Sequence, residues 1–80
     1  MSTSTVTKIN AAAADVQFST DELIVTLADG RVLSVPLEWF PSLRDASPEA
    51  RAHWRLIGQG VGIHWEELDE DISVAGLLAA

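Results

Sequence analysis

The first half of the chain alternates apolar and polar residues in short stretches. Val16 and Phe18 share one face of a first stretch. A second stretch places Leu23, Val25 and Leu27 on one face. An apolar side chain at every second position is typical of a strand with one buried face. The pattern therefore predicts two short strands, joined through residues 19–21.

A hairpin turn follows, because Asp29 and Gly30 lie between two apolar stretches. Asp-Gly supplies the backbone angles of a tight turn, so residues 31–35 are predicted to form the return strand. Pro36 has no backbone donor and ends the pairing. Residues 37–41 are then expected to make a turn or one helical turn that places two aromatic side chains on the sheet.

A helix is predicted to begin at residues 47–49, Ser-Pro-Glu. This sequence offers a capping hydroxyl, a proline at the first helical position and a carboxylate in the first turn. The helix is expected to run to about Leu56, with Trp54 and Ile57 at helical spacing, and to stop at Gly58. Its two to three turns would cover one face of the sheet.

The remaining chain predicts a strand over residues 59–65, an acidic run at 66–71 and a short C-terminal helix capped by Ser73. Residues 1–14 are interpreted as a flexible tail, and residues 15–80 as a single α+β domain. The predicted fold is one small antiparallel sheet in the order β-β-β-α-β-α, with one covering helix and the short C-terminal helix. The predicted core is Phe18, Leu23, Val25, Leu33, Trp54, Ile57, Ile63 and Leu77.

The charge of the chain limits its partners. It carries 12 Asp and Glu against 5 Lys and Arg, a formal net charge of −7. Binding to nucleic acid or to an anionic membrane depends mainly on Lys and Arg, so neither is expected. The chain has no Cys, which excludes disulfides and thiolate metal sites. With no targeting segment recognised, a cytoplasmic location is expected.

Catalytic and metal-binding groups do not converge in the sequence. His53 lies in the predicted helix and His64 in a predicted strand, so their spacing brings no ligand set together. Three glycines at alternate positions over residues 58–62 follow a helix and enter a strand, the reverse of a dinucleotide-binding loop. We therefore expect no enzymatic activity, metal or cofactor. Only His64 beside Glu66 or Asp69 in a deep pocket would favour an enzyme.

Aromatic and acidic residues provide the best candidate interaction surface. A partly exposed Trp can anchor an interface, and Trp39 ranks first because it lies in a predicted loop. The acidic run is either a solvated face or the contact for a basic partner. The candidate partner-binding residues are Trp39, Trp65, Glu66, Glu67, Asp69, Glu70 and Asp71.

Distinctive strings recur along the chain from Ala28 onward. They are residues 28–31 (ADGR), Pro36 and Leu37 with Phe40, Pro41 and Leu43, residues 46–49 (ASPE), Trp54, Gly58, Gly60, residues 62–65 (GIHW), residues 68–73 (LDEDIS), and Leu77 with Leu78. Together they resemble the bacterial family called domain of unknown function 2442, over nearly the whole chain after the tail.

The resemblance implies a compact α+β domain. It also implies a domain that is sometimes fused to a helix-turn-helix DNA-binding domain and is often encoded beside a small partner protein in a toxin and antitoxin pair. The 80 residues leave no room for a helix-turn-helix domain, so direct DNA binding is not expected here. The family brings no established catalytic residues to carry over.

Two hypotheses for function follow. The first is a protein-interaction module, antitoxin-like in its role, whose acidic segment 66–71 and nearby aromatic residues bind a small basic partner protein. The alternative is a homo-oligomeric regulatory or small-ligand-binding domain, with its site between the sheet and the turn at residues 58–62. A homodimer fits both, because so short a chain gains stability from association.

Overall fold

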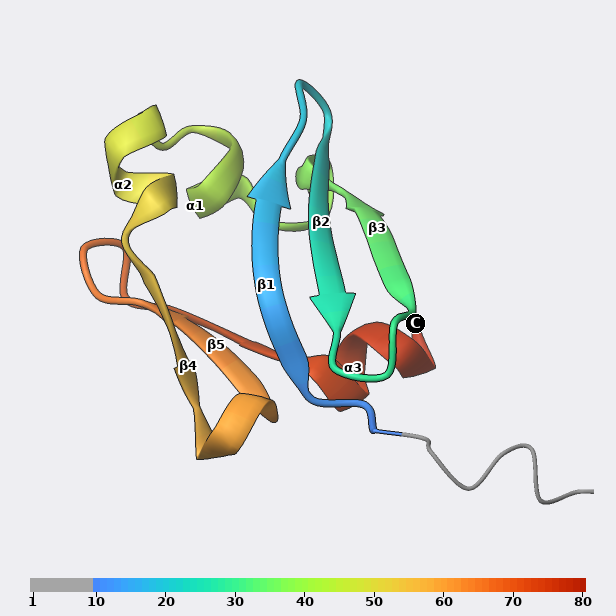
Figure 1. Cartoon of the computed structure of the whole chain (residues 1–80). Helices are drawn as coiled ribbons and strands as arrows, with labels where there is room; N and C mark the ends of the chain where they lie inside the picture. Colours follow the sequence, from blue (N-terminus) through green and yellow to red (C-terminus); the bar gives the residue numbers. More distant parts are fainter. Residues whose placement is uncertain (1–9) are drawn as a thin grey trace, which may run out of the picture.

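Two three-stranded antiparallel sheets form the fold (Figure 1). The computed structural model describes residues 10–80. The first sheet contains β1 (Ala13–Phe18), β2 (Glu22–Leu27) and β3 (Val32–Pro36), and the second contains β4 (Trp54–Ile57), β5 (Gly62–Trp65) and β6 (Glu70–Ser73). The short helical segments are η2 (Leu37–Trp39), α1 (Pro41–Arg44), α2 (Pro48–Ala52), η3 (Gly58–Gly60) and α3 (Val74–Ala79). The α+β class is confirmed, and the prediction of a single sheet is wrong.

The first sheet follows the alternation in the sequence. Alternate β2 residues, Leu23, Val25 and Leu27, face the core, as predicted. β1 begins at Ala13, within the stretch interpreted as a tail, and residues 1–9 of that stretch lie outside the described residues. The pairing of β1 with β2 shifts by one residue between Ala13 and Asp15. This bulge lets both Ala13 and Val16 face the core, although they are three residues apart.

The turn between β2 and β3 is held by Asp29. Its carboxylate accepts hydrogen bonds from the backbone amides of Asn10 (3.0 Å) and Arg31 (3.1 Å), and it forms an ion pair with the Arg31 guanidinium (2.9 Å). The side-chain hydrogen bond from Arg31 and the bond from the Asn10 amide lower the pKa of Asp29 to about 2. The turn predicted from Asp29 and Gly30 is thus confirmed, and it also holds the chain that enters β1.

The predicted covering helix is wrong. The Ser47 hydroxyl caps α2 as expected, accepting a hydrogen bond from the Ala50 amide at 3.1 Å, but α2 ends at Ala52. Residues 54–57 form β4 instead, because pairing with β5 supplies their backbone partners and turns Trp54 and Leu56 toward the core. Within residues 10–80, the longest helix is α3, with six residues. No helix in this part of the chain is long and apolar enough to span a membrane.

Both sheets contribute to one hydrophobic core. Of the predicted core residues, Leu23, Val25, Ile63 and Leu77 are buried, and Phe18, Leu33 and Trp54 are partly buried against the core. The prediction is wrong for Ile57, which lies on the opposite face of its sheet. The buried residues outside the predicted core list are Ala13, Val16, Leu27, Val35, Leu37, Leu43, Trp65, Ile72 and Val74.

Trp65 joins the two sheets at the centre of this core. Its side chain is fully buried, and its ring meets the Phe18 ring edge-on with centroids 6.3 Å apart. The indole Nε1 donates a hydrogen bond to the Arg51 carbonyl at 3.0 Å. The Arg51 guanidinium lies over the Phe18 ring and donates to the carbonyls of Leu43 and Arg44. These contacts fix α1 and α2 against the junction of the sheets.

Candidate functional site

The outer face of the second sheet carries two rows of paired residues. Cross-strand partners in an antiparallel sheet share a face. Leu56, Ile63 and Ile72 form a row that packs in the core, so the rows on either side of it face outward. We define this outer face by its six residues: a charged row of Arg55, His64 and Asp71, and a groove row of Ile57, Gly62 and Ser73.

His64 is the centre of the charged row. Its Nδ1 is hydrogen-bonded to the Asp71 carboxylate, and its Nε2 lies 3.6 Å from Glu66 Oε1. The same Glu66 oxygen accepts a hydrogen bond from Arg55 Nε at 3.1 Å. The imidazole is therefore held between two carboxylates, and polar contacts link the row across three strands.

This cluster meets only part of the condition that would favour an enzyme. His64 lies beside Glu66, as that condition required, but its second partner is Asp71 and not Asp69. The cluster lies on the face of a sheet, and Asp71, but not His64, lines the adjoining groove. Among the described residues, no group of three or more His, Cys, Asp or Glu is arranged to hold a metal ion.

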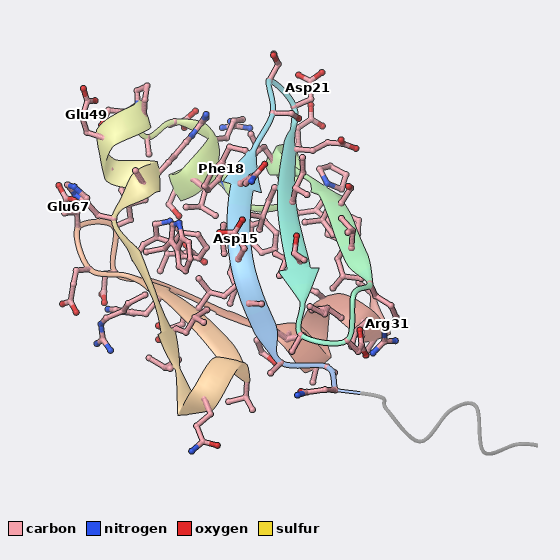
Figure 2. All side chains as sticks on the ribbon, viewed as in Figure 1. Asp15, Phe18, Asp21, Arg31, Glu49 and Glu67 are labelled. Carbon is pink, nitrogen blue, oxygen red and sulfur yellow. The ribbon has the colours of Figure 1, made fainter. Side chains whose placement is uncertain are left out.

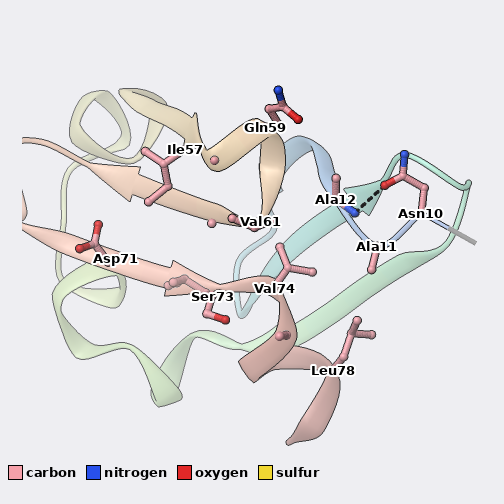
Figure 3. A pocket seen from close by; sticks show the side chains of 14 residues that line it. Asn10, Ala11, Ala12, Ile57, Gln59, Val61, Asp71, Ser73, Val74 and Leu78 are labelled. Carbon is pink, nitrogen blue, oxygen red and sulfur yellow. Dashed lines mark hydrogen bonds between the residues drawn. The ribbon is translucent and has the colours of Figure 1, made fainter.

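The groove row forms the floor of an apolar groove of about 680 Å³ (Figure 3). A Cβ on Gly62 would lie 3.0 Å from Ile57 Cγ1, so the glycine allows Ile57 to lie across the sheet. Val61, Val74 and Leu78 line the walls, together with the segment at Ala12. The Val74 amide donates to the Val61 carbonyl at 3.0 Å and joins the two sides of the groove. The close backbone packing expected of these glycines is present.

A second glycine fixes the turn that borders the groove. Gly60 has a φ of +97°, and a Cβ at this position would lie 2.7 Å from the Ala13 carbonyl oxygen. Only glycine fits both the backbone angle and the close approach. The turn at η3 is therefore packed directly against the start of β1, and the groove lies between the second sheet and the segment that enters β1.

The acidic run 66–71 is a hairpin turn followed by a strand. Glu66 contacts Arg55, Glu67 contacts His53, and the Ser42 hydroxyl donates to Glu70. Asp71 contacts His64, and Asp69 adopts a left-handed backbone angle in the turn, with a φ of 51°. Leu68, within the run, packs against the core. We call residues 66–71 the acidic hairpin.

The two tryptophans proposed for partner binding lie in different environments. Trp39 has 52% of its surface exposed, whereas Trp65 has 0%. The bond from Ser42 to Glu70 places the segment that carries Trp39 beside the acidic hairpin. Ser42 lies in α1, three residues after Trp39, and the η2 segment that carries Trp39 is bonded to the loop between β1 and β2, where the Leu37 amide donates to the Asp21 carbonyl at 2.9 Å. Trp65 lies in the core.

Several residues of this surface were not identified from the sequence. Arg55 was assigned to a helix, and the exposed Val61 and Leu78 were given no role in a site. The glycines over residues 58–62 were the available signal, because they marked a reversal of the chain, and the alternative hypothesis placed a ligand site there. The groove lies at that turn.

Comparisons with known proteins identify relatives of the chain. A family profile described as Protein of unknown function (DUF2442) matches residues 13–80. The crystal structure of a protein of unknown function from Rhodospirillum rubrum is similar, with 34% identity, a TM-score of 0.72, and coverage of 85% of this chain and 84% of that chain.

A second solved structure shares the same fold. The solution NMR structure of an uncharacterized protein from Chromobacterium violaceum, CV0863, has 27% identity and a TM-score of 0.72. The match covers 85% of this chain and 64% of that chain. No curated protein matches the chain.

Proposed function

This chain belongs to the family described as Protein of unknown function (DUF2442), which supplies no function, so we propose one from the chain's own surface. The chain is a small protein-interaction module that binds a small basic partner protein. An antitoxin-like role is one form that such a module takes. The binding surface consists of the acidic hairpin and Trp39.

The concentration of charge in the acidic hairpin carries this proposal. Five carboxylates lie within its six residues, and one guanidinium, that of Arg55, pairs with them. His53 and His64 also contact the hairpin but add positive charge only when protonated. Even with both histidines protonated, the five carboxylates outnumber these three cations, so the hairpin stays negative. Such a field attracts a basic protein and accelerates its association.

Trp39 supplies the apolar part of the contact. About half of its surface is exposed and available for burial by a partner. Burying an indole is among the most favourable contributions to an interface. Ser42, three residues after Trp39, donates to Glu70, so a partner that covers both the hairpin and η2 can contact the indole. Electrostatic attraction would determine the association rate, and contact with the indole would slow dissociation.

The test begins with the tagged protein purified from its native host at low and at high salt. We expect one small basic protein in stoichiometric amount at low salt and its loss at high salt. The association rate of this protein is then measured for the wild type and for the double variant Glu67→Lys, Asp69→Lys. We expect a decrease of about tenfold or more at low salt.

The matched control is the double variant Asp15→Lys, Glu22→Lys. It makes the same change in net charge on β1 and β2 of the first sheet, and Figure 2 shows Asp15 on β1, away from Glu67 at the left edge of the molecule. Its association rate should decrease much less. Equal rates for the hairpin variant and the wild type, with both folded, would contradict the proposal. Recovery of the protein alone as a stable dimer would also contradict it.

The apolar groove favours a second candidate, a homo-oligomeric regulatory or small-ligand-binding domain. Its volume of about 680 Å³ lies within the range of small-molecule sites, and it lies at the turn where the sequence analysis placed such a site. A ligand that binds only the folded state raises the midpoint of thermal unfolding. Thermal stabilisation by a metabolite, lost in the variant Val61→Ser, Leu78→Ser, would support this candidate.

A further inference from the structure

The groove and the charged row are adjacent on one sheet and differ in chemistry. Asp71 belongs to the charged row and also lines the groove. Same-face residues two apart along a strand are about 7 Å from each other. The charged row therefore begins one such step from the groove row, and a single bound segment can contact both.

The walls of the groove expose apolar side chains to solvent. Four large apolar side chains are exposed among the described residues, and two of them, Val61 at 64% and Leu78 at 40%, line this groove. Grouped exposed apolar side chains mark interaction surfaces more often than single ones do. Covering these two side chains would remove apolar surface from water and favour binding.

Charge decides which kind of occupant fits. A second copy of this chain would bring a net charge of −7 and another acidic hairpin against Asp71 and Glu66. Like charges at an interface oppose association, whereas a cation opposite these carboxylates favours it. Asp71 is 70% exposed and keeps room to accept a second donor besides His64. The complementary occupant is basic beside its apolar group.

We propose that the groove receives an aliphatic side chain from an extended segment of the basic partner, and that a Lys or Arg two residues away pairs with Asp71. This inference rests on the proposed function and adds the chemistry of the segment that docks. Same-face residues of an extended segment have the same spacing as the two rows, so both contacts form together.

The test uses synthetic peptides, which do not require the natural partner. The probe is a short capped peptide in which Leu and Lys stand two residues apart, separated by Ser. Two control peptides replace Leu with Ser or Lys with Glu. Binding to the full chain is followed by the amide chemical shifts of the isotope-labelled protein. We expect the probe to shift the amides of residues 61, 71 and 73, and each control peptide to bind about tenfold more weakly.

Protein variants provide the second part of the test. The variant Val61→Ser, Leu78→Ser should weaken binding of the probe about tenfold, because the apolar contact is lost. The matched control is Val32→Ser, which changes a side chain that is 57% exposed and lies on β3, outside the groove, and it should bind as the wild type does. The shift map of the wild type requires no variant, so it remains decisive if the double variant does not fold.

Several results would overturn this inference. Equal affinities of the Leu and Ser peptides would show that the apolar contact does not contribute to binding. Shifts confined to the first sheet would remove the site, and a concentration-dependent dimer lost in the Val61→Ser, Leu78→Ser variant would identify a second copy as the occupant. Failure here, with a slower association for the acidic-hairpin variant, leaves the proposed function intact. An unchanged association rate for the hairpin variant refutes the proposed function instead.

Discussion

The two sheets share one core but present different outer faces. On the first sheet the outward rows are Gln17, Ile24 and Ser34, and Asp15, Thr26 and Val32, with the pair Glu22 and Pro36 at one end. On the second sheet they are Arg55, His64 and Asp71, and Ile57, Gly62 and Ser73. Both sheets have three antiparallel strands, so the difference lies in the side chains and not in the architecture.

The first outer face is built on longer strands and carries two charged residues, Asp15 and Glu22. Asp15 accepts a hydrogen bond from Gln17 on the same strand. The second outer face has charges paired across strands, next to a groove. Under the proposed function, the first sheet serves as the scaffold and the second carries the binding surface.

The largest expected effect on stability comes from a substitution of Trp65, where the two sheets meet. We expect Trp65→Ala to lower the free energy of unfolding by about 3–5 kcal/mol, because it removes a fully buried ring and leaves the Arg51 carbonyl without its indole donor. Trp39→Ala, at an exposed position, should change it by about 0.5 kcal/mol or less. Urea unfolding followed by circular dichroism measures both. Equal losses would contradict the burial difference between the two tryptophans.

A smaller effect is expected where the turn of the second sheet meets the first. Gly60→Ala should destabilise the protein by about 2 kcal/mol, because φ is positive there and the new Cβ would meet the Ala13 carbonyl. Gly76→Ala is the matched control. Gly76 lies inside α3, and a Cβ there would make an ordinary contact with Ser73, the N-cap. It should stabilise the protein by roughly 0.5–1 kcal/mol. If both variants changed the midpoint of thermal unfolding in the same direction, the close packing of Gly60 against Ala13 would be refuted.

The smallest effect concerns the turn of the first sheet alone. Arg31 and the Asn10 amide lower the pKa of Asp29 to about 2, below its ordinary value of 3.8. Ionised Asp29 therefore stabilises the fold above pH 4, and this stabilisation is lost as the pH falls from about 4 toward 2. A carboxyl NMR titration should give a midpoint near 2 in the wild type and a higher one in Arg31→Gln. An ordinary midpoint in the wild type would show that the ion pair is absent in solution.

The first sheet was largely predictable from the sequence. Its strands alternate cleanly, and Asp29 with Gly30 marks the turn between two of them. These signals are local, because they depend on neighbouring residues and on the geometry of one turn. The start of β1 at Ala13 was not predicted, since the bulge interrupts the alternation there.

The second sheet was predictable only in part. β5 was recognised, but β4 was assigned to a helix because Trp54 and Ile57 fall at helical spacing. β4 forms because it pairs with β5, and the local pattern of residues 54–57 does not predict that pairing. β6 was missed because Glu70 and Asp71 are both acidic, although Glu70 contacts Ser42 and Asp71 faces outward to His64. Arg55, His64 and Asp71 come together only when the three strands pair. The sequence therefore indicated Asp71 as a candidate residue but not its contact with His64.

Mapping the contact with the basic partner that we expect to co-purify with this chain tests the central claim most directly. The amide chemical shifts of the labelled protein would be recorded with and without that partner at low salt. We predict that the largest shifts fall on the acidic hairpin and the outer face of the second sheet, at residues such as His64, Asp71 and Ser73, with little change at Ile24, Thr26 and Ser34. Largest shifts on the outer face of the first sheet would contradict the account.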